Sequence, residues 1–152
     1  MSAPDIVVAT AARWVEKAEG DLVTARNNIQ AKTPGPTDST CFHAQQCVEK
    51  YLKALLVYRG IDFPRTHDIE EILSFVPPRA RPVLTPEDQR RLTRYATVTR
   101  YPGDYDPIPL NEARRAMLLA RKVRAFIRKR LPVEALTLAS SRLQPKPGKN
   151  AR

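Results

Sequence analysis

The sequence predicts an all-α fold, an up-and-down bundle of four long helices plus one short helix. Apolar residues recur at steps of three and four over several stretches. No stretch shows the sustained alternation of apolar and polar residues that is typical of a half-buried strand, so we expect no sheet. The 14 prolines lie between the periodic stretches and only 5 glycines occur, which indicates helices joined by proline-containing loops.

The first two helices are predicted on either side of a break rich in proline. The first spans about residues 11–31, and its apolar face is made of Trp14, Ala18, Leu22, Ala25 and Ile29. The second spans about residues 39–59, with Asp38 or Ser39 as the expected cap. It stops before Gly60, because glycine is the residue expected just beyond a helix C-terminus.

Capping signals then predict the short helix and the fourth helix. Asp68 with Glu71 resembles a capping pair for a short helix over residues 69–75. Thr85 followed by Pro86 is a strong start for a helix that runs to about residue 99. The last helix is predicted over about residues 110–130. Its apolar face is made of Ala113, Ala116, Met117, Ala120, Val123 and Ile127.

The chain of 152 residues divides into an N-terminal extension (1–10), one helical bundle (11–132) and a C-terminal tail (133–152). We expect the tail to be largely disordered, although its 133–143 part is apolar enough for a loose helix. Residues 1–10 lack a secretory signal and no run reaches the length of a membrane span, so we expect a cytoplasmic protein. Cys41 and Cys47 project from different sides of one helix, and free thiols fit a reducing cytosol.

A net charge of +10 indicates affinity for polyanions such as nucleic acid, a nucleotide or an acidic protein. The alternative is that the charge only keeps the chain soluble. Much of the charge lies on the last predicted helix, which contains one acidic residue, Glu112, and eight basic residues. The basic residues are Arg114, Arg115, Arg121, Lys122, Arg124, Arg128, Lys129 and Arg130.

Two groups of residues are candidates for ligand binding. In the second helix, steps of three and four place one polar ridge on a single face, made of His43, Gln46, Lys50 and Lys53. Such a ridge can contact phosphates or a partner helix, and the alternative is an ordinary solvated face. Between the last two long helices, Arg100 can grip a phosphate, and Tyr101 and Tyr105 can stack on a base.

The alternative for this second group is structural. Arg100 then pairs with Asp104 or Asp106, and the tyrosines pack against the end of the bundle. No metal or other cofactor is indicated, because His43 and His67 lie on separate elements without a further ligand at diagnostic spacing. The sequence also contains no phosphate-binding loop and no dinucleotide fingerprint.

Three short motifs together resemble the HEPN domain family (higher eukaryotes and prokaryotes nucleotide-binding). They are the run 44–56 with Gln45-Gln46 and Glu49-Lys50, the step 64–69 with Thr66-His67-Asp68, and Arg100-Tyr101-Pro102. The similarity covers about residues 14–131. It implies a helical bundle that forms homodimers and associates with minimal nucleotidyltransferases in toxin–antitoxin or related defence systems.

The resemblance also implies a metal-independent endoribonuclease motif, an arginine followed after four to six residues by a histidine. Here Tyr105 stands after four residues, and no histidine follows His67. An ordinary tyrosine pKa of about 10 suits proton transfer less well than the value of about 6.5 of histidine. We therefore favour a non-catalytic module that binds RNA, a nucleotide or a nucleotidyltransferase. Two alternatives are a ribonuclease toxin, which uses Arg100 with Tyr105 or with an imidazole from His43 or His67, and a dimeric scaffold without a nucleic-acid role.

Overall fold

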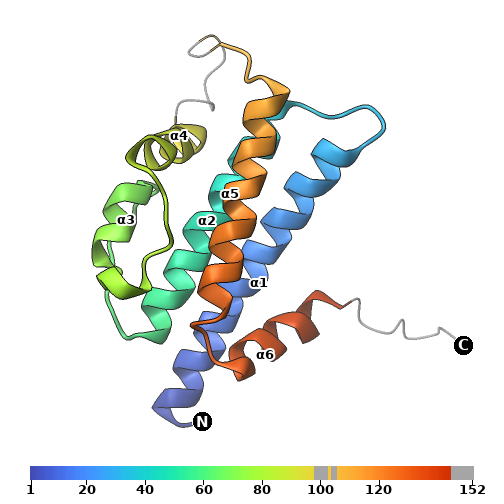
Figure 1. Ribbon diagram of the computed structural model, residues 1–152. Helices are drawn as coiled ribbons and strands as arrows, with labels where there is room; N and C mark the ends of the chain where they lie inside the picture. Colours follow the sequence, from blue (N-terminus) through green and yellow to red (C-terminus); the bar gives the residue numbers. More distant parts are fainter. Residues whose placement is uncertain (98–102, 104–105, 145–152) are drawn as a thin grey trace, which may run out of the picture.

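A computed structural model describes residues 1–97, 103 and 106–144, and these residues form helices without any strand. The prediction of an all-α fold is confirmed. The helices are α1 (Ala3–Gln30), α2 (Thr37–Tyr58), α3 (Ile69–Phe75), α4 (Pro86–Thr97), α5 (Leu110–Arg128) and α6 (Val133–Leu143), with a 3₁₀ turn η1 (Pro78–Ala80) after α3. In Figure 1, α1, α2 and α5 run side by side along the length of the molecule.

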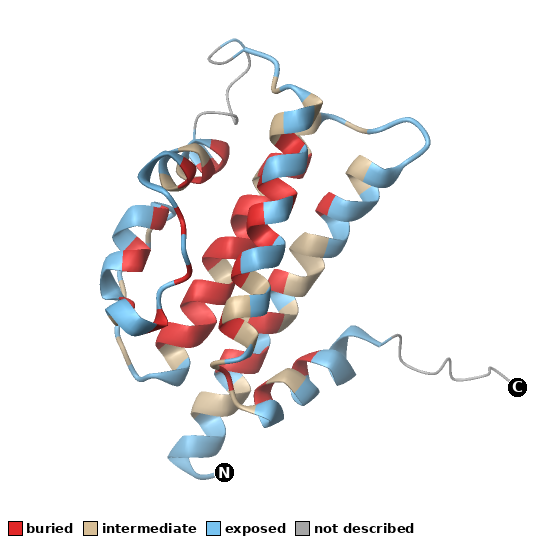
Figure 2. Ribbon diagram, viewed as in Figure 1, coloured by how far each residue is buried: buried red, intermediate tan, exposed pale blue. Residues whose placement is uncertain are grey.

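The core of the bundle is built around α2, which packs against α1, α3, α4 and α5. Figure 2 shows buried residues along most of α2, whereas the helices around it are buried on one side. The largest fully buried apolar side chains are Tyr51, Leu52, Leu55, Leu56, Ile69, Ile72, Leu92 and Ile127. Because α2 is central, several of its polar residues are buried as well.

Two of the predicted helix starts are confirmed by hydrogen bonds. The side chain of Asp68 accepts a bond of 3.1 Å from the amide of Glu71 at the start of α3. The hydroxyl of Thr85 accepts one of 3.1 Å from the amide of Asp88 at the start of α4. Gly60 follows α2 with a φ of 67°, the left-handed conformation that favours glycine at this position.

The prediction that Asp38 or Ser39 caps α2 was wrong. The helix already begins at Thr37, its N-cap residue is Pro36, and no side chain caps it. Instead, the hydroxyl of Thr37 donates a bond of 2.7 Å to the carbonyl of Ile108. The start of α2 is therefore tied to the segment before α5, a contact between distant parts of the chain that local capping rules do not foresee.

The first helix begins at Ala3 rather than at about residue 11, so most of the predicted N-terminal extension is helical. The amide of Ser2 donates 2.9 Å to the carboxylate of Asp5, and the amide of Asp5 donates 3.3 Å to the hydroxyl of Ser2. This reciprocal pair is a capping box, which stabilises the first turn.

The apolar 133–143 part of the tail, for which a loose helix was the expectation, forms the helix α6 and is not disordered. Ala135 and Ala139 are buried, and α6 packs against α1. Small side chains allow the two helices to approach closely, as the contact of Ala135 with Ala11 and Ala12 shows. Residues 145–152 lie outside the described part of the chain.

Cys41 and Cys47 are both buried, and neither forms a disulfide, as predicted. Burial raises the pKa of Cys41 to about 12, and it raises the pKa of Cys47 as well. Both groups are therefore protonated thiols at neutral pH. Among the described helices, none is both long enough and apolar enough to cross a membrane.

Candidate functional site

Arg100, Tyr101 and Tyr105 lie outside the described residues, so their roles stay predictions. The two helix ends that flank them are described and are linked to each other. The hydroxyl of Tyr95, near the end of α4, donates 2.6 Å to the carboxylate of Glu112 at the start of α5. Burial and the bond to Glu112 together raise the pKa of Tyr95, so the phenol stays protonated and the link persists at neutral pH.

The polar ridge predicted on α2 divides into two groups that face different parts of the molecule. His43 and Lys50 face α1, where both contact Asp21. The Nδ1 atom of His43 lies 2.8 Å from one carboxylate oxygen of Asp21, and Nζ of Lys50 lies 2.5 Å from the other. All three side chains are partly buried, so this group couples α1 to α2 and still reaches solvent.

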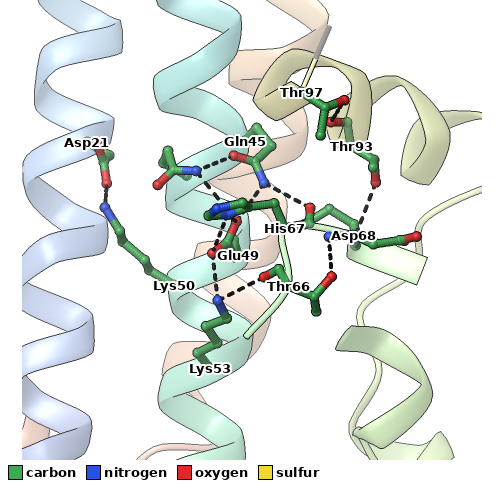
Figure 3. Close-up of polar contacts among 12 residues, drawn as sticks. Asp21, Gln45, Glu49, Lys50, Lys53, Thr66, His67, Asp68, Thr93 and Thr97 are labelled. Carbon is green, nitrogen blue, oxygen red and sulfur yellow. Dashed lines mark hydrogen bonds and ion pairs between the residues drawn. The ribbon is translucent and has the colours of Figure 1, made fainter. Parts of the chain in front are cut away.

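Gln46 and Lys53 turn toward a second group that centres on Glu49. Figure 3 shows Lys53, Gln45 and His67 around Glu49. Nζ of Lys53 donates 2.7 Å to Glu49, and Nε2 of Gln45 donates 2.8 Å to it. Nδ1 of His67 lies 3.0 Å from the same carboxylate. The Glu49 side chain is only 3% exposed and that of Lys53 8%.

The environment of Glu49 keeps its carboxylate ionised. Burial by itself raises the pKa of this group, because a charge is costly away from water. The hydrogen bonds from Lys53, Gln45 and His67, together with the charge of Lys53, outweigh that effect and leave the pKa below its usual value. The ion pair is therefore intact at neutral pH.

The Glu49 group also fixes the segment that leads into α3. Nζ of Lys53 donates 3.0 Å to the carbonyl of Thr66, and Nε2 of Gln45 lies 3.4 Å from the carbonyl of His67. Gln46 donates 2.6 Å to the side chain of Gln45 and so supports it from the same helix. Two of the three motifs noted in the sequence are thus in direct contact.

Sequence reasoning missed two of the residues on which these groups depend. Asp21 was not singled out in the sequence, and Glu49 was noted only as part of the run 44–56. The spacing of Gln45, Glu49 and Lys53 at successive steps of four was a signal for a helical network. No local signal pointed to Asp21, because its partners lie on another helix.

Ion pairs to other helices use part of the basic cluster on α5. Arg115 forms a bidentate pair with Asp88 of α4, in which Nε donates to one carboxylate oxygen at 3.2 Å and Nη2 to the other at 3.0 Å. Arg124 and Arg128 both donate to Glu19 of α1, at 2.6 and 3.2 Å. Four basic residues of α5 and its C-terminal end are exposed and form no ion pair with another described residue. They are Arg114, Arg121, Lys122 and Lys129. These four residues are called the basic face below.

The basic face lies on one side of α5, because steps of seven residues return to the same side of a helix. Leu118 lies between Arg114 and Arg121 and is 47% exposed. A surface with four cations can contact a phosphate backbone or an acidic protein. Among the described residues, no group of three or more histidine, cysteine or acidic side chains could hold a metal ion.

This all-helical fold and its arrangement of motifs match a known family. The family model of the HEPN domain matches residues 11–130, which is most of the chain. The chain therefore belongs to the HEPN domain family.

One curated relative is 44% identical over 52 residues, a protein of Methanocaldococcus jannaschii described as "Putative toxin MJ1304". That stretch is 34% of this chain and 32% of the relative, so the chain spans about a third of the length of the curated relative it matches. No solved structure was found to match the chain.

Proposed function

We propose that this chain is the HEPN component of a two-component toxin–antitoxin or defence system. In this role it binds RNA, a nucleotide or a partner nucleotidyltransferase and does not itself cleave RNA. Membership of the family supports such a system, and so does the name "Putative toxin MJ1304" of the Methanocaldococcus jannaschii relative. Homodimer formation is part of the proposal, since the family resemblance implies it.

The observation that carries the non-catalytic role is the location of the imidazoles. The sequence contains only two histidines and none after His67. The Nδ1 atom of His43 is held by Asp21 and that of His67 by Glu49, so each imidazole has a structural partner on α1 or α2. The position that the ribonuclease motif gives to histidine is Tyr105, whose phenol is a weak proton shuttle at neutral pH.

A ribonuclease is the second candidate, because one observation favours it. The His67 side chain is 50% exposed and its Nδ1 is held by a buried carboxylate. A carboxylate in this position fixes the ring and its tautomer, as in many general bases. His67 would then supply the missing imidazole next to a bound RNA.

Two assays on the full chain separate these functions. Cleavage of single-stranded RNA is measured with a chelator present, and RNA affinity is measured as a function of salt. The proposal predicts no cleavage and an affinity whose logarithm falls linearly with the logarithm of salt concentration, because bound phosphates release counterions. With about four contacts from the basic face the slope is roughly −3 for single-stranded RNA.

Cleavage that survives chelation and is lost in Arg100→Ala and His67→Asn would replace the proposal with the ribonuclease. The variant His43→Asn is the matched control, since His43 contacts Asp21 on the α1 side. An absence of both cleavage and binding at low salt, for RNA and for a nucleotidyltransferase partner, would leave only the scaffold. Light scattering at micromolar concentration tests the homodimer independently.

A further inference from the structure

The imidazole of His67 lies in a groove of about 550 Å³ next to the Glu49 group. The lining residues come from α1, α2 and the segment before α3, and they are Trp14, Lys53, Phe63, Arg65, Thr66 and His67. The His67 side chain is 50% exposed, whereas that of Glu49, which holds it, is 3% exposed. The ring is therefore fixed from the inside of the protein and accessible from the outside.

The contact with Glu49 decides which ring nitrogen of His67 carries the proton. Nδ1 lies 3.0 Å from one carboxylate oxygen and 3.2 Å from the other (Figure 3). The pKa of Glu49 lies below its usual value, and an ionised carboxylate only accepts hydrogen bonds, so Nδ1 must donate. The neutral ring then has an unshared electron pair on Nε2. No hydrogen bond from the described part of the chain reaches Nε2.

The two aromatic rings of the groove are already covered. Nζ of Lys53 lies 5.6 Å from the ring centroid of Trp14 and 5.8 Å from that of Phe63. The ammonium therefore occupies the position over these rings that a stacked ligand would need. Its ion pair with Glu49 holds it there. A molecule that reaches Nε2 of His67 must bind without these rings, which favours a small polar molecule.

The polar rim of the groove favours an anion. Lys53 and His67 both contact Oε1 of Glu49, so the ammonium is close to the imidazole. Arg65 is exposed and has no ion-pair partner among the described residues. None of the six lining side chains is acidic. The planar fork of a guanidinium matches the oxygens of a phosphoryl group, so a small phosphorylated molecule suits this rim.

We propose that Nε2 of His67 is a phosphoryl acceptor and that its donor is a phosphoramidate, a compound in which phosphorus is bonded to nitrogen. A nucleophile held by a buried carboxylate and placed beside an unpaired arginine is suited to this transfer. Because one P–N bond replaces another, the transfer needs no large driving force. The site goes beyond the proposed function and does not rest on it, since that function depends on the basic face of α5 and on Arg100.

The transfer balances without a further reactant. In the simplest phosphoramidate, whose nitrogen is protonated, the electron pair of Nε2 attacks phosphorus and forms the new P–N bond. The old P–N bond breaks, and its electron pair leaves with the donor nitrogen as ammonia. Nδ1 of His67 keeps its proton, so the product is a phosphorylated imidazolium whose positive charge faces the carboxylate of Glu49. Arg65 binds the phosphoryl oxygens on the groove side.

The full chain is incubated with potassium phosphoramidate at neutral pH, both native and unfolded in urea. Mass spectrometry of peptides kept at alkaline pH, where phosphohistidine is stable, identifies the labelled residue, and phosphorus NMR identifies the ring nitrogen. We expect one phosphoryl group per native chain, on Nε2 of His67, added at least about tenfold faster than in urea. In urea the carboxylate no longer holds Nδ1, so both ring nitrogens of both histidines should be labelled.

Two pairs of variants locate the acceptor and its anion contact. His67→Asn should abolish the label of the native chain, whereas His43→Asn should keep it, because His43 packs against Phe42 and does not line the groove. Arg65→Ala should slow labelling about tenfold, since it removes a hydrogen bond between charged groups. Arg79→Ala is its matched control, because Arg79 is also exposed and lies on η1 outside the groove. Circular dichroism should confirm that all four variants fold.

Three results would overturn this site: labelling of His67 that is no faster in the native chain than in urea, native labelling on Nδ1 or equally on His43, or equal rates for Arg65→Ala and Arg79→Ala. Failure of the proposed function is a separate outcome. A chain that is phosphorylated on His67 but binds neither RNA nor a nucleotidyltransferase would refute that function and leave the phosphoryl acceptor standing.

Discussion

Glu49→Gln tests the central network of the bundle, because the change keeps the shape of the side chain and removes its charge. In the native chain the carboxylate balances the ammonium of Lys53, and both groups are nearly inaccessible to water. After the substitution the amide can still accept hydrogen bonds, but the buried cation has no counter-charge. The Lys53 ammonium then carries the desolvation penalty alone.

Removal of one partner from a buried ion pair costs about 3–5 kcal/mol. A folded domain is typically stable by only about 5–15 kcal/mol, so the loss is a large part of the whole. For a chain of this size, each kcal/mol lowers the melting temperature by about 2–4 °C. We therefore expect Glu49→Gln to lower it by roughly 6–20 °C.

The chain offers a matched control with the same spacing on a helix surface. Glu87 and Arg91 of α4 also form a pair one helical turn apart, at 2.7 Å, but their side chains are 64% and 42% exposed. Exposed pairs of this kind contribute about 0.3–0.5 kcal/mol. Urea unfolding followed by circular dichroism should show a small change for Glu87→Gln and a large one for Glu49→Gln.

The penalty also has a predictable pH dependence. Because the folded-state pKa of Glu49 lies below the ordinary value of 4.5, its contribution is complete above that value and is lost as the pH falls through the folded-state pKa. The difference between the native chain and Glu49→Gln should therefore shrink in acid. Equal losses for the two glutamine variants at neutral pH would show that Glu49 and Lys53 do not form a buried pair.

Three further predictions concern other parts of the bundle. Glu19→Gln weakens the bonds from one tyrosine and two arginines and should lower the unfolding free energy by about 2–3 kcal/mol in urea titrations. Cys41 and Cys47 should resist thiol reagents at pH 8 in the native chain, because burial raises the pKa of both thiols. Both should react fully in denaturant, and fast labelling of the native chain would contradict this prediction. Asp68→Ala removes the cap of α3 and should cost about 1 kcal/mol, whereas a cost near zero would mean that α3 is held by packing alone.

Local signals allowed much of the fold to be predicted. Asp68 and Thr85 identified helix starts because a side chain and an amide three residues away are close in any helix. The start of α1 was not predicted although Ser2 and Asp5 have the same spacing, because the apolar periodicity that marks the helix begins only later in the sequence. The apolar residues of α6 were noticed, but a short helix needs its contact with α1 to be stable, and the sequence does not show this contact.

The candidate site was less predictable because its geometry depends on which helix is central. Helical periodicity correctly placed His43, Gln46, Lys50 and Lys53 on one side of α2. It could not indicate that α1 and the segment before α3 cover this side and divide the four residues into two groups. Contacts such as Arg124 with Glu19 join residues far apart in the chain and depend on how helices pack, which local patterns do not determine.

Two of the motifs that suggested the family are parts of one structural unit. Glu49 and Lys53 come from the run in α2, and Thr66 and His67 come from the step before α3. Two of the contacts that join them are the bond from Lys53 to the carbonyl of Thr66 and the contact of His67 with the carboxylate of Glu49. The carboxylate fixes the imidazole, and the ammonium fixes the backbone that carries it. The same ammonium lies over the rings of Trp14 and Phe63, so loss of Glu49 should also disturb the packing of these rings. A Glu49→Gln variant that loses stability but keeps the native Trp14 fluorescence spectrum would show that the rings and the network are independent.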